Sequence, residues 1–271
     1  MSGIDLVVTD LDGTLWYSST DVALHPRTTA AIEELRSRGV GLLVATGRRL
    51  ASTRSALAQH DLRPPAVVLN GAMVVDLATD ERIHRHAFEP DDAAAVLRHF
   101  LDAGVSPCLY VEHDEVDVFV GDDPSTHPDH LRSFGEWARP DDLESVVRTQ
   151  PVLAFGVISI PADQVADVYA KVGDIANAHL ADERGYSGGV TLTVAPPDLS
   201  KWDGVVAFCA ARGYDPTRVL AIGDGPNDLE LLDGAAVAVV MEDGHPEALA
   251  RADHLAGPAD EGGWADLLDL L

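Results

Sequence analysis

The sequence predicts an α/β fold, in which a parallel sheet has helices on both faces and a second, α+β module is inserted into it. Short runs such as Ile4–Thr9 and Val219–Ile222 are mostly apolar, as in strands buried on both faces. Segments with helical spacing alternate with these runs. Strands that alternate with helices form parallel sheets, which gives the first part of the prediction.

The elements of the parallel sheet follow one another in chain order. After the strand Ile4–Thr9, helical spacing predicts a helix over Pro26–Gly39, with its last residue as a left-handed C-terminal cap. Val40–Ala45 is the next buried strand. The remaining elements of this part are a helix at Leu50–Gln59, strands at Ala66–Leu69, Val219–Ile222 and Val237–Val240, and a short helix near Asn227–Leu232.

The middle of the chain has a different pattern, which predicts the inserted module. Its expected strands are Ile83–Phe88, Cys108–Glu112, Val116–Val120, Val152–Ile160 and Val190–Val194, with helices at Asp91–Ala103 and Ala162–Leu180 and a loop at Asp122–Pro128. Ser200 and Gly213 are suited to begin and end the helix at which the first pattern resumes. We therefore expect one domain at 1–80 and 197–271 and a second at 81–196.

The formal charge of −26 over 271 residues argues against a nucleic-acid or membrane partner, because the field repels phosphate backbones and anionic lipid surfaces. The same field opposes small anionic substrates. A phosphate-binding site in such a chain needs a local source of positive charge, from a metal, helix ends or a few basic side chains. Only two lysines, Lys171 and Lys201, are present.

The cysteines and the N-terminus indicate the compartment. Cys108 and Cys209 are far apart and form no metal-binding cluster, so we expect two buried free thiols and neither a disulfide nor a zinc site. No basic segment followed by an apolar run begins the chain, and no apolar stretch of about 18 residues occurs. These features predict a cytoplasmic protein, with the oligomeric state open between monomer and homodimer.

Two acidic segments follow directly after predicted buried strands, where open parallel sheets bind ligands. The first is DLDGTL at residues 10–15, in which Asp10 could attack a substrate while Asp12 handles protons. The second is GDGPND at residues 223–228, whose carboxylates suit Mg²⁺. Either segment alone could be a solvated or Gly/Asn/Asp-rich turn.

Two further segments supply groups that bind phosphate. Thr46-Gly47-Arg48 follows the second strand and offers a hydroxyl and backbone N–H groups at the start of a helix. Lys201, next to Ser200, provides a point charge suited to a phosphoryl group. By themselves these are more often a capped turn and a surface lysine.

Together, in this order, the four segments resemble the motifs of the haloacid dehalogenase superfamily, and more narrowly its Cof-type sugar-phosphatase branch. The resemblance implies a Rossmann-like core with an α/β cap inserted after the second motif, and a Mg²⁺-dependent phosphatase acting on a small phosphorylated metabolite, such as a sugar phosphate. Asp10 would be the nucleophile and Asp12 the general acid and base. Thr46 and Lys201 would hold the phosphoryl group.

The resemblance also implies the binding residues. Mg²⁺ would be held by the Asp10 side chain, the backbone carbonyl of Asp12 and Asp224, with support from Asp228. Substrate contacts would be Gly47, Arg48, Asn70, Gly71 and Asn227. In the cap, Tyr110, His113, His127, Arg132 and Tyr186 are possible contacts, although each is more often packed or solvated, and the pair His127 and His130 is expected to be solvated.

The chain departs from the family pattern at three places, and three other functions stay open. Asp198 and Trp202 flank Ser200-Lys201, where the family has glycine, and Trp202 could narrow the pocket. Residues 241–247 replace a usual loop of the family. A phosphosugar mutase or other phosphotransferase would return the phosphoryl group to substrate. A non-catalytic regulatory protein would keep the fold alone. A haloacid dehalogenase would not need the second aspartate or the metal site.

Overall fold

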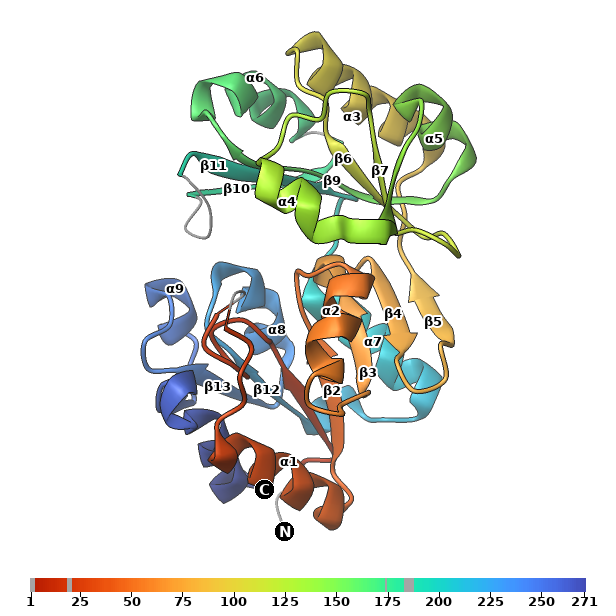
Figure 1. The fold of residues 1–271 in the computed structure, drawn as a ribbon. Helices are drawn as coiled ribbons and strands as arrows, with labels where there is room; N and C mark the ends of the chain where they lie inside the picture. Colours follow the sequence, from red (N-terminus) through yellow and green to blue (C-terminus); the bar gives the residue numbers. More distant parts are fainter. Residues whose placement is uncertain (1–2, 19–20, 174, 183–187) are drawn as a thin grey trace. The chain divides into compact units, whose positions relative to one another are not determined.

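The computed structural model describes residues 3–18, 21–173, 175–182 and 188–271, which belong to two compact units (Figure 1). The first unit comprises Met1–Arg48, Thr53–Arg85 and Ser200–Leu271, and the second comprises Arg49–Ser52 and His86–Leu199. The sequence predicts domain boundaries after residues 80 and 196, and we keep these boundaries as a proposal. No helix in the described ranges is long and apolar enough to cross a membrane.

The first unit is built on an eight-stranded sheet with the order β14-β13-β12-β1-β2-β3-β4-β5. Its strands are β1 (Leu6–Thr9), β2 (Gly41–Ala45), β3 (Pro65–Val68), β4 (Met73–Asp76), β5 (Arg82–Arg85), β12 (Val219–Gly223), β13 (Val237–Met241) and β14 (His254–Ala256). The strands from β14 to β3 pair in parallel, and β4 and β5 are antiparallel additions at one edge.

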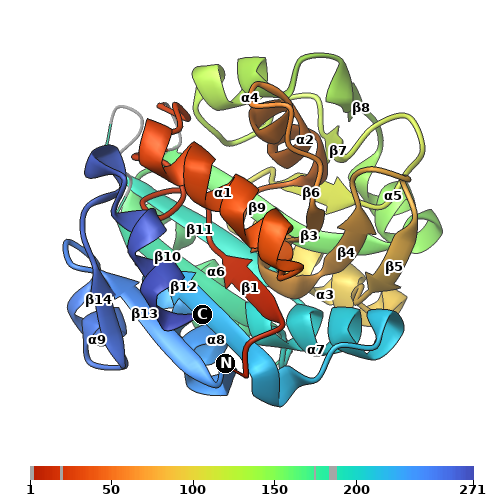
Figure 2. The same ribbon diagram turned by 90° about the horizontal axis from the view of Figure 1, so that it is seen from below.

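Helices cover both faces of this sheet. They are α1 (Pro26–Arg38), α2 (Leu50–Ala58), α7 (Lys201–Arg212), α8 (Leu229–Gly234) and α9 (Pro246–Leu249). Figure 2 shows α1 over one face and α7 and α8 over the other. Val205 and Phe208 of α7 and Leu231 of α8 share one buried cluster with Leu6 and Leu43 of the sheet. Burial on both faces explains why the central strands are apolar at nearly every position.

The second unit is an α+β module with a six-stranded sheet in the order β10-β11-β9-β6-β7-β8. The strands are β6 (Cys108–Val111), β7 (Val118–Val120), β8 (Ala138–Pro140), β9 (Val152–Ile160), β10 (Asn177–Asp182) and β11 (Val190–Ala195), and the helices are α3 (Pro90–Asp102), α4 (Pro128–Phe134), α5 (Leu143–Thr149) and α6 (Ala162–Val172). Side chains of α3, α5 and α6 form its core with the sheet, around Phe88, Phe100 and Phe155.

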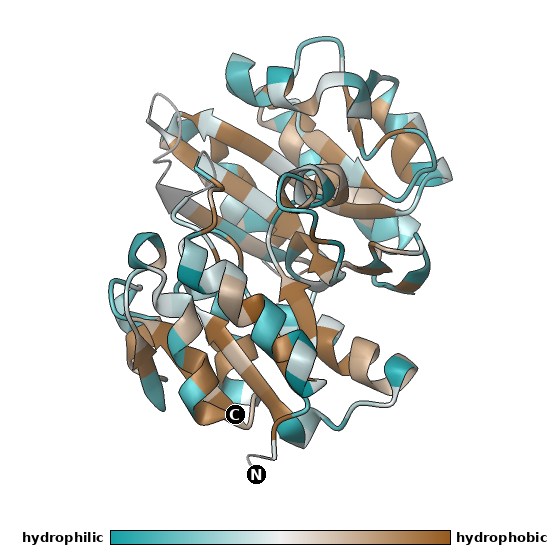
Figure 3. Ribbon diagram, turned by 60° about the horizontal axis from the view of Figure 1, so that its bottom comes forward, coloured by the Kyte–Doolittle hydropathy of each residue, from teal (hydrophilic) through white to brown (hydrophobic). Residues whose placement is uncertain are grey.

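The distribution of hydropathy agrees with this layering. Figure 3 shows strands that are mostly hydrophobic and helices that are hydrophobic along one side only. Gly39 and Gly213 end α1 and α7 in the left-handed conformation, with φ of 73° and 77°, as expected from the sequence. Cys108 and Cys209 are buried free thiols, which confirms that expectation too.

Two element predictions are wrong. The strand expected at Ile83–Phe88 within the inserted module is β5, which pairs with β4 in the sheet of the first unit. The helix expected to run from Ala162 to Leu180 ends at Val172, and Asn177–Asp182 instead pairs with β11 as strand β10. In both cases pairing with the neighbouring strand decides the outcome, since β5 pairs with β4 and β10 with β11, and the periodicity within one segment does not record such pairing.

Candidate active site

The motif residues of the first unit lie at the ends of neighbouring parallel strands. Asp10 follows β1, Thr46 follows β2 and Asp224 follows β12. Thr9 is in register with Val44 of β2 and with Ile222 of β12, so the three residues leave the sheet at the same edge. The carboxyl edge of a parallel sheet is the usual place for a ligand.

A cluster of three carboxylates forms the centre of this edge. Oxygen atoms of Asp10, Asp224 and Asp228 lie within 4.8 Å of one another. Thr14 donates its hydroxyl to Oδ1 of Asp224 at 2.6 Å, and the backbone N–H groups of Asp224 and Gly225 donate to Oδ2 of Asp228 at 3.1 and 2.9 Å. These donors fix the carboxylates of Asp224 and Asp228 in place and occupy only some of the lone pairs on their oxygens.

Lys201 supplies the positive charge of the cluster. Its Nζ donates to Oδ1 of Asp10 at 2.8 Å and to Oδ1 of Asp228 at 2.7 Å, and the side chain is fully buried. Ser200 and Asp203 form a capping box that begins α7 at this lysine and so fixes its position. Burial by itself lowers the pKa of Lys201, but the charges of Asp10 and Asp228 outweigh it and hold the pKa above its ordinary value.

The pKa values of two of the carboxyls are raised. Burial raises the pKa of Asp10 well above its ordinary value, Lys201 opposes this, and the like charges of Asp228 and Asp224 add to it. Burial also raises the pKa of Asp224 to about 6, although the hydrogen bond from Thr14 acts in the other direction. A cation bound here would therefore displace protons from the site.

Asp12 lies outside the carboxylate cluster and has partners of its own. Arg48 donates Nε to Oδ2 of Asp12 at 2.6 Å and Nη2 to Oδ1 at 2.5 Å, which makes a bidentate pair. The indole Nε1 of Trp16 donates to Oδ1 at 2.8 Å, and the guanidinium of Arg48 lies 5.4 Å from the centre of the Trp16 ring. The side chain of Asp12 is thus held in a defined orientation by the guanidinium of the second motif and by the indole that follows the first motif.

The other expected substrate residues gather beside this pair. The backbone N–H of Arg48 donates to Oγ1 of Thr46 at 3.2 Å, and Thr46 accepts the N–H of Asn70 on its carbonyl at 3.1 Å. Asn227 donates Nδ2 to Oδ1 of Asn70 at 3.1 Å, which links the second and fourth motifs. Gly47 packs against the same Oδ1, since a Cβ at Gly47 would lie 3.1 Å from it.

The turn after β3 has a strained backbone. Asn70 has φ of 53° and Leu69 has φ of 50°, a region that side chains rarely adopt, and Gly71 follows with φ of 116°. The turn thereby directs Asn70 toward Thr46 and Asn227. Such conformations occur often at functional sites.

Two residues that donate hydrogen bonds to the carboxylates, Thr14 and Trp16, are not among the site residues expected from the sequence. Thr14 belongs to the first motif, and its position next to the glycine turn was the available signal. Trp16 follows that motif without any such signal, because its contact with Asp12 depends on how the loop folds. Gly13 permits the loop to approach Asp224, since a Cβ at Gly13 would lie in contact with Oδ2 of that residue.

Two of the three departures from the family pattern, Trp202 and the loop of residues 241–247, have structural roles. Trp202 is half-buried and packs against Gly234 at the end of α8, as part of the core between α7 and the sheet. In the loop of residues 241–247, the N–H of His245 donates to the carbonyl of Asp224 at 2.7 Å. The replaced loop therefore supports the backbone of the fourth motif.

In the second unit, the candidate contact residues are mostly packed. Tyr110 is buried, with its hydroxyl 3.4 Å from Nε2 of His130, and Nδ1 of His130 lies 2.9 Å from the hydroxyl of Thr126. The expectation that His130 is solvated is wrong, because it faces the interior beside Phe134. Tyr186 lies outside the described residues.

Comparison with known proteins assigns the family. A family model described as haloacid dehalogenase-like hydrolase matches residues 7–268. The HMP-PP phosphatase of Cronobacter sakazakii is 28% identical over 250 residues, which cover 91% of this chain and 87% of that protein.

Solved structures share the fold. The structure of TM0651 from Thermotoga maritima has a TM-score of 0.82 at 19% identity and covers 99% of this chain and 97% of that one. BT4131, described as a sugar phosphatase of haloacid dehalogenase subclass IIB, has a TM-score of 0.76 at 21% identity, with 98% of each chain covered. These similarities confirm the α/β fold class and the family predicted from the motifs. The chain is therefore a member of the haloacid dehalogenase-like hydrolases, and thus of an enzyme family.

Proposed function

We propose that this chain is a Mg²⁺-dependent phosphatase that hydrolyses a small phosphorylated metabolite, with a sugar phosphate as the leading class, through an aspartyl-phosphate on Asp10. The observation that carries the proposal is the buried cluster of Asp10, Asp224 and Asp228 around Lys201 at the carboxyl edge of the sheet. We place the enzyme in the cytoplasm, and we assign substrate selection to the second unit.

The donor set of the cluster fits Mg²⁺. All three side chains offer carboxylate oxygens, the hard ligands that Mg²⁺ prefers, and no histidine or cysteine belongs to the group. The Asp10 and Asp224 side chains would hold the ion, together with the backbone carbonyl of Asp12, and Asp228 would support these ligands. When bound, the ion supplies positive charge that offsets the repulsion between a carboxylate and a phosphate.

The reaction divides between Asp10 and Asp12. An oxygen of Asp10 forms a bond to phosphorus as the bond from phosphorus to the leaving oxygen breaks, and Asp12 gives a proton to that oxygen. In the second half, Asp12 takes a proton from water, the water oxygen bonds to phosphorus, and the bond to Asp10 breaks. The products are the dephosphorylated alcohol and free phosphate, and the cycle ends with Asp10 again a carboxylate and Asp12 again protonated.

The phosphoryl group would be bound by the side chains of Lys201, Thr46 and Arg48. Lys201 already donates to Asp10, so it lies where it can also contact the oxygens of the phosphoryl group whose phosphorus Asp10 attacks. Arg48 occupies both oxygens of Asp12, and it has to release one of them before Asp12 can donate a proton. An incoming phosphate offers Arg48 another bidentate acceptor, which would free Asp12 as substrate binds.

Phosphate release from 4-nitrophenyl phosphate and a panel of sugar phosphates tests the proposal. We expect release that requires Mg²⁺, stops with a chelator, and is lost in Asp10→Asn. Asp260→Asn, at an exposed position of the same unit, should retain full activity. Wild-type protein that releases no more phosphate than Asp10→Asn from every ester would refute the proposal. Isomerised product without free phosphate would favour a phosphotransferase.

A further inference from the structure

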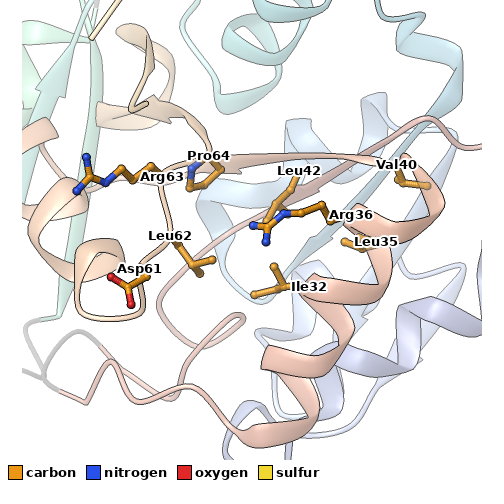
Figure 4. Close-up of a pocket in the computed structure, with 9 residues that line it drawn as sticks. All are labelled: Ile32, Leu35, Arg36, Val40, Leu42, Asp61, Leu62, Arg63 and Pro64. Carbon is orange, nitrogen blue, oxygen red and sulfur yellow. The ribbon is translucent and has the colours of Figure 1, made fainter. Parts of the chain in front are cut away.

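A cavity of the first unit lies at the opposite end of the strands from the carboxylate cluster. It has a volume of about 380 Å³ and lies between α1, the start of β2 and the connection from α2 to β3 (Figure 4). Leu42 lines it near the start of β2, whereas Thr46 follows the end of that strand. Four residues of strand span about 13 Å, so this cavity is separate from the candidate active site.

Six of the nine residues that line the cavity are apolar and three are charged. Its apolar lining residues are Ile32, Leu35, Val40, Leu42, Leu62 and Pro64. Four of these residues, from Val40 onward, are partly exposed to solvent. An apolar group bound in the cavity would bury this surface, which is energetically favourable. The volume falls in the lower range for small-molecule sites, about 300–1,000 Å³.

Arg36 and Arg63 give the cavity a positive charge in a strongly acidic chain. Within the described ranges, neither guanidinium has an ion-pair or hydrogen-bond partner, and one acidic residue, Asp61, lines the cavity with them. By contrast, Arg27, Arg38 and Arg218 on the surface of the same unit all pair with carboxylates. In Figure 4 the guanidinium of Arg36 is drawn between Leu42 and Ile32.

We propose that this cavity binds a small organic anion with an apolar body, whose carboxylate or phosphate pairs with Arg36. The apolar body would contact the side chains of Leu42 and Leu62, and Arg63 would add a weaker long-range attraction from the rim. Arginine pairs with such anions through two parallel hydrogen bonds, and the contact over apolar side chains strengthens them by excluding water. The site is independent of the phosphatase chemistry.

Two probes of equal shape separate charge from apolar contact: 4-methylbenzoate and the uncharged 4-methylbenzamide. Methyl NMR of the full-length protein, with labelled isoleucine, leucine and valine, would report the site of binding and the Kd. We expect saturable shifts at Ile32, Leu35, Leu42 and Leu62, with the anion binding at least about tenfold more tightly than the amide.

Variants test the assigned arginine. Arg36→Gln should remove the preference for the anion while the rest of the methyl spectrum stays unchanged, which shows an intact fold. Arg98→Gln, at an exposed arginine of α3 in the other unit, should bind both probes like wild type. The proposal fails if Arg36→Gln keeps the preference, if the shifts map to methyl groups near Asp10, or if millimolar probe gives no saturable shift.

Discussion

The ammonium nitrogen of Lys201 lies 2.8 Å from Oδ1 of Asp10 and is buried together with it. One lysine thus faces the proposed nucleophile in a cluster that also holds Asp224 and Asp228. Attraction to the carboxylates compensates for the loss of water around the ammonium, and the lysine in turn lowers the repulsion among them. The same side chain therefore contributes to both folding and chemistry.

Replacing Lys201 by methionine should impair activity and stability together. We expect phosphatase activity to fall by about 10²–10³, since a preorganised donor to the phosphoryl group is lost. The free energy of unfolding at neutral pH, without metal, should fall by roughly 3–5 kcal/mol, because the carboxylates lose their buried partner. Urea denaturation and phosphate release measure the two effects.

Lys171→Met is the matched control for that substitution. Lys171 is the other lysine of the chain and is exposed on α6. The Lys171→Met variant should have the same phosphatase activity and the same free energy of unfolding as wild type, within experimental error. A Lys201→Met protein with unchanged stability would contradict the role of the ion pair in folding, whatever its activity.

Without metal, the protein should become less stable as pH rises from about 4 through about 6. The pKa of Asp224 is raised to about 6 in the folded state, against about 3.9 in an unfolded chain. The folded state thus binds more protons in this range, and stability falls with pH. Asp10, whose pKa is also raised, acts in the same direction.

Urea denaturation in a chelator, over pH about 4 to 8, would measure this dependence. Asp224→Asn should flatten it, and Asp260→Asn should not. Added Mg²⁺ should stabilise the protein increasingly as pH rises, because the ion competes with protons for the same oxygens. Stability that rises through this range in the chelator would show that the carboxyls are not buried as described.

The central sheet and its motif residues could be predicted because their signals are local. β1, β2 and β12 are apolar at nearly every position, and glycine with carboxylates follows β1 and β12, whereas Thr46-Gly47-Arg48 follows β2. Asp10, Asp224 and Lys201 could therefore be assigned to one edge before any contact between them was known.

The contacts that need folding could not be predicted in this way. The pair of Arg48 with Asp12 spans 36 residues, and the hydrogen bond from Trp264 to Thr9 spans 255. The identity of β5 and β10 also depends on neighbours in the sheet, as their polar or short sequences fit several structures. Packing in the folded protein decides which residues and strands become partners, and no local pattern in the sequence indicates these pairs.

Gly234→Ala should destabilise the first unit by about 1–3 kcal/mol through overpacking. An added Cβ would lie 2.6 Å from the indole nitrogen of Trp202, and the ring is part of the packed layer under α7. Thermal unfolding would measure the loss. Gly173→Ala is the control, because a Cβ there meets nothing within 4 Å, and it should be neutral or slightly stabilising.

Trp16→Phe should slow the hydrolysis of alkyl phosphates more than that of aryl phosphates. The indole N–H donates to Oδ1 of Asp12 at 2.8 Å, and phenylalanine removes that bond while it keeps most of the buried ring. Asp12 would lose part of its fixed orientation, so we expect about a tenfold loss of kcat on a sugar phosphate, whose leaving alkoxide needs a proton. Nitrophenolate leaves without one, and activity on 4-nitrophenyl phosphate should change little.

Asp12→Asn sets the scale for that comparison. Loss of the general acid should reduce turnover of the sugar phosphate by about 10²–10⁴, again with a smaller effect on the aryl ester. Measuring both variants on both esters separates proton transfer from packing, because a purely structural defect lowers the two rates by the same factor. An equal loss on both esters in Trp16→Phe would assign Trp16 to the core of the first unit and leave Arg48 as the partner that orients Asp12.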